Sequence, residues 1–276
     1  EFRAKKFINN NRQKGEKVQF FRRSMLQVMV SGALCSALPS IAFAQTQKLA
    51  PEYDVIVIGS GFAGLAAAIS AAENGAKVAV LEKMQVAGGN SSRSGGMMAI
   101  PGSSVQKEQG IEDSPAKLAA DMKRIGLGLG DPEHIKVVTE HAAPTFEWTK
   151  KQGVVWRTDL TGKGGHSARR CLITEEGTGQ GILIPFMKKL KELGVPVFTG
   201  MKVIRLDKNK DGRVIGVTAL EDYKFGKEDS GKSVEIKAKD GVILAFGGFS
   251  ADVGYRTRLD PKLTGNLKTT NQPGAT

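Results

Sequence analysis

The stretch YDVIVIGSGFAGLAAAISAAENGAKVAVLE, Tyr53 to Glu82, decides the fold of this chain. An apolar run leads into three glycines with GxGxxG spacing, Gly59, Gly61 and Gly64, and an alanine-rich segment that is compatible with a helix follows. A second apolar run then ends at the acid Glu82. Strand, glycine turn, helix, strand and terminal acid together have the spacing of a βαβ unit that holds a dinucleotide.

Each residue of this motif has a predicted role. Gly59 permits the tight turn, Gly61 lets backbone N–H groups approach a pyrophosphate, and Gly64 lets the helix pack closely on the strand. The positive end of the helix then faces the phosphates. Glu82 closes the second apolar run, where its carboxylate can accept hydrogen bonds from ribose hydroxyls. The motif alone is equally compatible with NAD and with FAD.

The net charge of +12 is concentrated near the N-terminus. Residues 1–44 carry eight Lys and Arg against two Asp and Glu, a balance of +6, so the same charge is spread over the much longer remainder, residues 45–276. Aromatic residues make up 6% of the chain, which leaves few rings to interleave with basic side chains and stack on bases. We therefore expect no nucleic-acid partner.

Residues 1–44 are predicted to be an export signal region. Arg22 and Arg23 precede a moderately apolar segment, and the small-residue pattern Ala42-Phe43-Ala44 is typical of a cleavage site. The double arginine resembles the twin-arginine signal of proteins that are exported already folded. A membrane anchor is less favoured, because several serines and Pro39 dilute the apolar run. We expect a periplasmic protein without a stable membrane span.

The segment Val86 to Ser104 is predicted to be a loop, because it is too polar and too rich in glycine for a helix or a strand. Its glycine doublets favour contact with a flat ligand over the alternative of a flexible linker. Three helices are expected further along the chain, Ser114 to Leu127, Asp131 to Lys151 and Gly177 to Leu193. The first two begin with a capping residue followed by proline.

The last third of the chain is expected to be largely β. A strand at Val195–Thr199 precedes a three-stranded antiparallel meander, KVIRLDKN, RVIGVTAL and SVEIKA, whose first two strands are joined by Asp211-Gly212. The meander leads into GVILAFGGFS, Gly241 to Ser250, which is predicted to be a buried strand that ends in a glycine pair. TTNQPGAT, at the end of the chain, is predicted to be an exposed loop. The fold class predicted for residues 45–276 is α/β.

No metal site is predicted. The cysteines, Cys35 and Cys171, form no CxxC or CxxCH motif, so the chain encodes no zinc ribbon, iron–sulfur ligand set or covalent c-type haem site. His134 and His141 would share one face of a helix without a third ligand, which favours surface or packing roles. His166 is predicted to lie in a loop, where contact with a ligand and a solvated position are equally compatible with the sequence. Cys171 is interpreted as a small half-buried hydrophobe in preference to a reactive thiol.

The motifs DVIVIGSGFAGLAAAISAAENGAKVAVLEK, GGNSSRSGGM, ILAFGGF, LDPKL and TTNQPGAT resemble, in this order, the flavoprotein subunits of fumarate reductases and succinate dehydrogenases. The likeness is greatest to the soluble periplasmic branch, which includes the flavocytochrome c fumarate reductases and the methacrylate and urocanate reductases. It covers roughly residues 50–276. The resemblance implies a Rossmann-like FAD-binding domain with an inserted antiparallel β-meander. Since the family's substrate-capping domain follows the TNQPGA motif, residues 45–276 are expected to be the N-terminal part of the FAD-binding domain.

The resemblance also implies non-covalent FAD and a set of cofactor contacts. Ala63 would contact the pyrophosphate, Glu82 the adenosine ribose and Val203 the adenine side. Gly96 would touch the substrate as well as the flavin. Asn90-Ser91-Ser92-Arg93 fills the loop in which other members of the superfamily carry a histidine that binds the flavin covalently. The complete expected cofactor site is Gly59, Gly61, Ala63, Gly64, Glu82, Lys83, Gly89, Asn90, Ser91, Gly95, Gly96, Val203 and Gly247.

The reaction implied by the resemblance is reduction of the C=C bond of an unsaturated carboxylate, fumarate or a related enoate, by hydride from FAD N5. Electrons are expected from a separate multihaem c-type cytochrome, because this chain has no haem motif. No catalytic residue is assigned, since the family's substrate-clamping histidines and proton-donating arginine follow the TNQPGA motif. Arg169 and Arg170 are expected to be structural or solvated. Two alternatives stay open: a dehydrogenase or oxidase of the same superfamily, such as a ketosteroid dehydrogenase or an aspartate oxidase, and a non-catalytic FAD-binding fragment.

Overall fold

The computed structural model describes residues 47–162 and 164–274. The predicted export region, residues 1–44, lies outside the described residues. The strands are β1 (Glu52–Ile58), β2 (Val78–Glu82), β3 (Met97–Ala99), β4 (Cys171–Ile173), β5 (Val197–Thr199), β6 (Lys202–Lys208), β7 (Val214–Glu221) and β8 (Lys232–Leu244). The helices are α2 (Phe62–Glu73), the short 3-10 helix η2 (Gly89–Arg93), α3 (Ser104–Glu108), α4 (Pro115–Ile125), α5 (Pro132–Lys151), α6 (Gln180–Glu192) and α7 (Val253–Leu259). None of the helices in this described part is long and apolar enough to cross a membrane.

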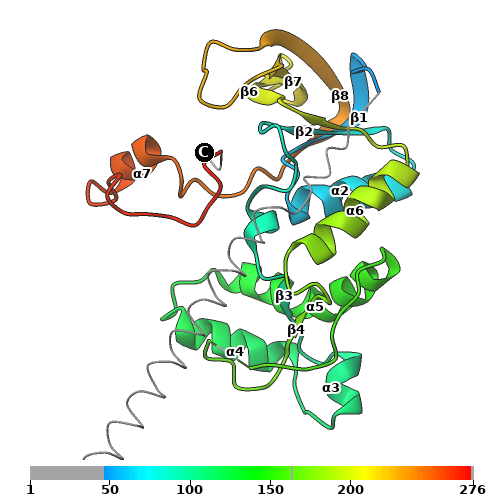
Figure 1. Ribbon diagram of the computed structural model, residues 1–276, viewed down its shortest axis with the longest axis vertical. Helices are drawn as coiled ribbons and strands as arrows, with labels where there is room; N and C mark the ends of the chain where they lie inside the picture. The colour runs from blue at the N-terminus through cyan, green and yellow to red at the C-terminus, as the bar shows by residue number, and fades with distance from the viewer. Residues whose placement is uncertain (1–46, 163, 275–276) are drawn as a thin grey trace, which may run out of the picture. The chain divides into compact units, whose positions relative to one another are not determined.

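A six-stranded sheet in the order β5-β2-β1-β8-β7-β6 carries the fold (Figure 1). β5, β2, β1 and β8 run parallel, and β8, β7 and β6 form the antiparallel part. The predicted βαβ unit is present, because β1 pairs in parallel with β2 and α2 connects the two strands. The architecture is therefore the mixed α/β fold that the sequence predicts.

Alternating side chains cover both faces of the central strands. Val57 packs with Leu65 of α2 and Phe186 of α6 in one buried cluster. Its neighbour Ile56 points to the other face and packs with Val217 and Ile236 of the meander in a second cluster. This period of two is why the almost continuously apolar β1 is buried between two layers.

The meander differs from the prediction at its third strand. SVEIKA and GVIL were expected to be two strands, but they are one continuous strand, β8. Its first half pairs antiparallel with β7 and its second half pairs parallel with β1. Lys239 and Asp240 form a bulge between the two halves, at the point where the register with β1 shifts. The polar pair therefore marks an irregularity in one strand and not the end of a strand.

The prediction that GVILAFGGFS is buried was wrong. Ile243 is 37% exposed, Leu244 is 53% exposed and Phe246 is 59% exposed. The buried cluster beneath α2 and α6 takes its strand residues from β1, β2 and β5, so this helical layer does not extend over the end of β8. The end of β8 is apolar in sequence, but among the described residues the helices do not reach far enough to cover it.

The predicted first residues were confirmed for two of the three helices. Ser114 caps α4 and Asp131 caps α5, each with proline at the first helical position. α6 was expected to begin at Gly177 but begins at Gln180, because Gly177 has a φ of +67° and lies in the turn before the helix. This left-handed backbone favours glycine and stops the helix from starting earlier.

The prediction that Val86 to Ser104 forms only a loop was also wrong. This segment contains η2 and β3, and it ends at the start of α3. β3 pairs with the distant strand β4, from Met97↔Ile173 to Ala99↔Cys171, although α3, α4 and α5 lie between the two strands in the sequence. Local composition could not show this strand, because its partner is distant in sequence.

Candidate cofactor-binding site

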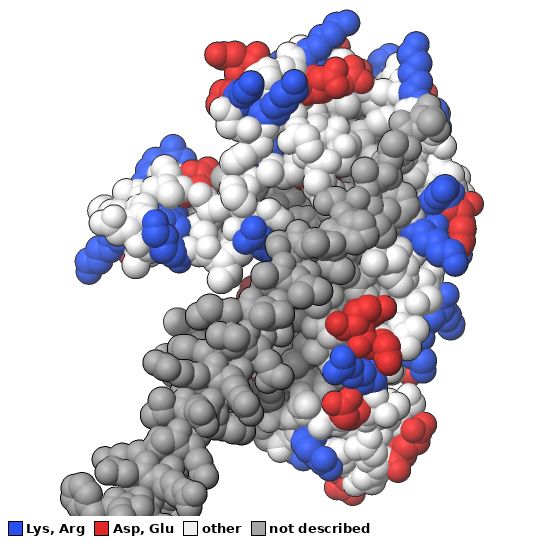
Figure 2. Space-filling view, viewed as in Figure 1, with Lys and Arg blue, Asp and Glu red and all other residues white. Residues whose placement is uncertain are grey.

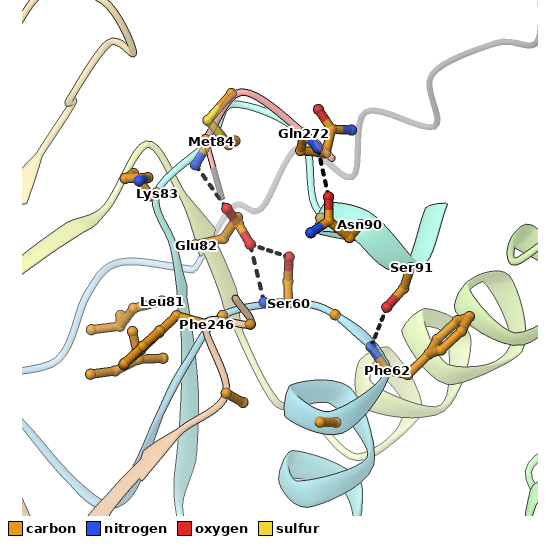
Figure 3. Close-up of a pocket in the computed structure, with 18 of the residues that line it drawn as sticks. Ser60, Phe62, Leu81, Glu82, Lys83, Met84, Asn90, Ser91, Phe246 and Gln272 are labelled. Atoms are coloured by element: carbon orange, nitrogen blue, oxygen red, sulfur yellow. Dashed lines mark hydrogen bonds between the residues drawn. The ribbon is translucent and has the colours of Figure 1, made fainter. Parts of the chain in front are cut away.

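A pocket of about 410 Å³ lies at the carboxyl ends of β1 and β2, and Figure 3 shows its polar contacts. Ligands of open α/β sheets bind at this end of the strands. Ten of the thirteen expected cofactor residues line the pocket: Gly59, Gly61, Ala63, Glu82, Lys83, Gly89, Asn90, Ser91, Val203 and Gly247. The structure thus brings together four stretches of the chain, around Gly59, Glu82 to Ser91, Val203 and Gly247.

The glycines after β1 bring the backbone close to the pocket. Gly59 has a φ of +102°, and a Cβ on it would lie 2.5 Å from the carbonyl oxygen of Ala245. A Cβ on Gly61 would lie 3.2 Å from Oγ of Ser91. Larger residues would therefore either strain the turn or push the neighbouring loop away from the pocket.

The N-terminus of α2 opens into the same pocket. Gly61 is the residue before the helix and Ala63, in its first turn, lines the cavity. The Phe62 N–H donates to Oγ of Ser91 at 2.9 Å, which fixes the η2 segment against the start of the helix. Amides at a helix N-terminus favour an anionic group such as a pyrophosphate.

Glu82 is the buried acid of the pocket, with an exposed fraction of 7%. Its Oε2 accepts hydrogen bonds from the amide and the hydroxyl of Ser60, and its Oε1 accepts one from the Met84 N–H at 2.9 Å. These bonds hold the carboxylate at the pocket wall (Figure 3). This is the place at which a dinucleotide fold needs an acceptor for a ribose hydroxyl.

Lys83 adds a positive charge beside this acid. Partial burial lowers the pKa of its ammonium group, and the nearby charge of Lys202 acts in the same direction. The Lys83 ammonium group lies 6.0 Å from the centre of the Phe225 ring in the β7–β8 connection. The connection therefore contributes to the surroundings of the pocket at the Glu82 end.

The end of the chain lies against the pocket. Residues 269–274 form a loop, as predicted, in which Thr269, Thr270 and Pro273 are exposed, but Gln272 and Gly274 are half-buried. The Gln272 N–H donates to Oδ1 of Asn90 at 2.6 Å, and Arg93 donates to the carbonyl oxygen of Thr270 at 3.1 Å. Gln272 and Gly274 are lining residues. Polar loop composition could not reveal these contacts, because both partners belong to the distant η2 segment.

Three expected cofactor residues lie outside the pocket lining. Gly64 packs against Gly59, where a Cβ would overlap the carbonyl oxygen, so its role in this structure is close packing of α2. Gly96 is buried with a φ of +64° and packs against the carbonyl oxygen of Thr178, and Gly95 is exposed. The flavin and substrate contacts expected of Gly95 and Gly96 stay predictions.

The sequence interpretation missed Ser60, Met201, Phe246 and Gln272 in the pocket. Ser60 occupies a variable position of the GxGxxG pattern and was given no role, although a hydroxyl between two glycines that expose the backbone could have indicated one. Met201 and Phe246 each lie two residues after the end of a strand, β5 and β8 respectively. Their position at strand ends, next to β1 and β2, was the available clue.

Arg170 has the structural role that the sequence favours. Its side chain is fully buried and bonds to Asp113 at 2.7 Å and to Asp121 at 2.6 Å. Hydrogen bonds to Asp113 raise the pKa of the guanidinium further. His166 lies in the same cluster, with Nδ1 3.0 Å from a guanidinium nitrogen of Arg170. For His166 the sequence left a ligand contact and a solvated position equally open, and in the structure this residue is half-buried and contacts Arg170.

The remaining candidates do not form a metal site. His134 and His141 are exposed on α5, and Cys171 is buried in β4. Across residues 47–162 and 164–274, no group of three or more His, Cys, Asp or Glu is arranged to hold a metal ion. Basic and acidic side chains are interspersed on the visible part of the face drawn in Figure 2. Lys202 with Glu228 and Lys239 with Glu52 are ion pairs of this kind.

The residues of the pocket fit FAD. The glycine turn and the first amides of α2 suit a pyrophosphate, and the buried carboxylate of Glu82 suits a ribose. Leu81, Met201 and Phe246 provide apolar wall for a planar ring. Most of these groups are backbone or apolar, which is usual for a site that positions a cofactor with few polar contacts.

Comparison with known proteins agrees with this fit. Residues 54–276 match the family described as FAD binding domain. The chain is 39% identical to the acrylate reductase flavoprotein subunit of Shewanella woodyi, over 92% of this chain and 51% of that protein. It is 38% identical to the urocanate reductase of Eggerthella lenta, over 83% of this chain and 37% of that protein. It is 35% identical to a fumarate reductase (cytochrome) of Shewanella frigidimarina, over 80% of this chain and 38% of that protein.

Solved structures show the same architecture. The open conformation of a flavocytochrome c3 fumarate reductase matches with a TM-score of 0.74 at 25% identity, over 91% of this chain and 41% of that one. The 3-ketosteroid-delta4-(5alpha)-dehydrogenase of Rhodococcus jostii matches with a TM-score of 0.71 at 26% identity, over 85% of this chain and 53% of that one. The chain thus spans about half or less of the length of these relatives. The matches show FAD as the cofactor.

Proposed function

Because this chain belongs to the FAD binding domain family, we propose that it is the cofactor-holding part of an enzyme that reduces the C=C bond of an unsaturated carboxylate. Acrylate, fumarate, methacrylate and urocanate are the substrates to compare. The observation that carries the proposal is the 39% identity to an acrylate reductase flavoprotein subunit over 260 residues. Relatives named urocanate reductase and fumarate reductase support the same chemical class.

The chain's own residues have the task of binding and orienting FAD. In this proposal the amides of the turn from Gly59 to Ala63 hold the pyrophosphate, and Glu82 holds the adenosine ribose. Asn90 and Ser91 of η2 support the flavin end, where Ser91 is itself fixed by the Phe62 N–H. Backbone amides and short side chains at fixed positions restrict how the flavin can sit, which is the usual contribution of a protein to cofactor chemistry.

When bound, FAD supplies a hydride donor for one alkene carbon. A proton for the other carbon and a cationic grip on the substrate carboxylate are also needed. We assign neither group among the described residues. Arg170 is excluded from these roles because its guanidinium is fully buried between Asp113 and Asp121.

Electron supply and location are further parts of the proposal. The relative from Shewanella woodyi is named a flavoprotein subunit, which supports delivery of electrons by a separate c-type cytochrome. Arg22-Arg23 and Ala42-Phe43-Ala44 support export to the periplasm. The two signal motifs are known from the sequence alone, since residues 1–44 lie outside the described residues.

Dehydrogenation of a saturated bond is the second candidate. It is favoured by the structural likeness to a 3-ketosteroid dehydrogenase at a TM-score of 0.71. The same cofactor pocket could serve either direction of hydride transfer, because in this proposal the described pocket residues would contact the cofactor and not the reacting bond. The identity of 26% over 85% of the chain is lower than that to the acrylate reductase subunit, so we prefer reduction.

A dye-linked assay tests the proposal. Full-length protein loaded with FAD is mixed anaerobically with reduced methyl viologen and, in separate runs, with acrylate, fumarate, methacrylate or urocanate. Oxidation of the dye by at least one acid is the expected result. If all four acids leave the dye reduced while a 3-ketosteroid reduces an acceptor dye, the dehydrogenase candidate replaces the reductase.

A further inference from the structure

Ser60 is the fully buried hydroxyl residue of the cofactor pocket. Its hydroxyl donates to Oε2 of Glu82 and accepts from the Gly88 N–H at 2.8 Å. Its own amide donates to the same Oε2 at 3.1 Å. The bonds to Glu82, drawn in Figure 3, connect the glycine turn after β1 to the end of β2. The bond from Gly88 adds the segment that leads to η2.

These bonds restrict the carboxylate of Glu82. Oε2 has two lone pairs, and the two donors of Ser60 occupy them. Oε1 accepts from the Met84 N–H, so one lone pair of Oε1 remains beyond these three bonds. The carboxylate therefore presents one defined acceptor position, and Ser60 determines which oxygen offers it.

The hydrogen bond from the Gly88 N–H to the hydroxyl of Ser60 extends the influence of Ser60 to the segment that leads to η2. Gly88 is buried with a φ of +114°, and it directly precedes η2, which carries Asn90 and Ser91. The hydroxyl of Ser60 satisfies the amide of Gly88 and so fixes the point at which this segment leaves the turn. Alanine at position 60 would leave the Gly88 amide without this partner and would remove one of the two donors to Oε2 of Glu82, while the amide of residue 60 stays as the other.

We propose that Ser60 is a positioning residue for FAD, acting through Glu82 to set the acceptor that binds the adenosine ribose. This inference rests on the proposed ribose contact of Glu82. The hydroxyl does not need to touch the cofactor, because its effect passes through the carboxylate. Loss of a hydrogen bond to a charged group predicts a roughly 10-fold to 100-fold weaker binding of any ligand that carries this ribose.

The test measures ADP and FAD binding to the full-length apoprotein. ADP carries the adenosine ribose and the pyrophosphate but no flavin, so it reports on this end of the pocket alone. Ser60→Ala is expected to raise the Kd of ADP and of FAD by about 10-fold or more. The matched control is Ser103→Ala, which removes a buried hydroxyl that caps α3 by accepting from the Gln106 N–H, outside the pocket lining. It is expected to lower the Tm without changing either Kd.

A double-mutant cycle with Glu82→Gln separates the inference from its premise. If Ser60 acts through Glu82, Ser60→Ala weakens ADP binding in the native background and has little further effect beside Glu82→Gln. An equal effect of Ser60→Ala in both backgrounds overturns the role of Ser60 and leaves that of Glu82 intact. An unchanged Kd for Glu82→Gln alone overturns the ribose contact itself.

A second variant covers the case in which Ser60→Ala does not fold. Ser60→Cys keeps a side chain of similar shape with a weaker donor. It is expected to bind ADP more weakly than the native protein, again only while Glu82 is present. Native affinity of a folded Ser60→Cys protein would overturn the proposal.

Discussion

Gly64 packs so closely on Gly59 that a side-chain carbon on Gly64 would overlap the carbonyl oxygen of Gly59. This contact joins the first turn of α2 to the end of β1, and the pocket lies beside it. The third glycine of the motif therefore acts through helix packing, while the first two bring the backbone to the cavity.

Replacing Gly64 by alanine is expected to separate α2 from β1 and to destabilise the protein by about 3 kcal/mol. The measurement is urea unfolding of the full-length protein, together with the fraction of FAD that stays bound. Gly241→Ala is the matched control, because a Cβ on Gly241 meets no atom within 4 Å. Equal stability of the two variants would contradict this packing role.

The buried Arg170 is expected to be essential for the stability of the part of the protein around α4. Asp113, like Arg170, has a fully buried side chain, so Arg170→Met would leave a buried carboxylate without its cation. Breaking such a pair costs about 3–5 kcal/mol. The solvent-exposed Arg205, which pairs with Asp207, provides the control, since water screens this pair and Arg205→Met should change the Tm little. Thermal unfolding of both variants tests the difference.

The same cluster predicts how stability depends on pH. Burial acts to raise the pKa of Asp113, but hydrogen bonds from Arg170 and Gln106 outweigh it, so the pKa lies below its usual value. The hydrogen bond from Arg170 also lowers the pKa of Asp121. Folded-state pKa values below the unfolded ones stabilise the protein at neutral pH, and this contribution is lost as the pH falls below about 4. Unfolding free energy measured between about pH 6 and about pH 3 should fall less steeply in Asp121→Asn than in the native protein.

The flavin is expected to be released by denaturation. Asn90 to Arg93 offers no histidine to form a covalent bond, and the contacts of this segment in the structure are hydrogen bonds. After acid precipitation of the purified protein, FAD should remain in the supernatant. Yellow colour that stays with the washed precipitate would contradict non-covalent binding.

The export prediction concerns the mature N-terminus. N-terminal sequencing of the periplasmic protein is expected to begin at Gln45, after the Ala42-Phe43-Ala44 pattern. Replacing Arg22 and Arg23 by lysine should leave the protein in the cytoplasm, whereas the control Arg12→Lys should not. Export that is unaffected by the double replacement would exclude the twin-arginine route.

The sequence predicted the βαβ unit and two helix starts because these depend on local patterns, whereas most of the other pocket residues were implied by the family resemblance. Gly59, Gly61 and Glu82 can be recognised from their spacing within one continuous stretch of the chain. The contacts that were missed join distant segments: β3 with β4, Gln272 with Asn90, and Ser60 with Gly88. The prediction that the end of β8 is buried was wrong for another reason. Its apolar residues predict burial, but burial also needs a covering layer, which the described helices do not provide there.

The most direct test of the central claim is a single-turnover experiment that needs no electron donor. The FAD of the full-length protein is reduced by light under anaerobic conditions and is then mixed with acrylate, fumarate, methacrylate or urocanate. We predict that at least one acid restores the absorbance of oxidised flavin at a rate that rises with its concentration. Flavin that stays reduced with all four acids, yet is reoxidised at once by air, would contradict the proposed function.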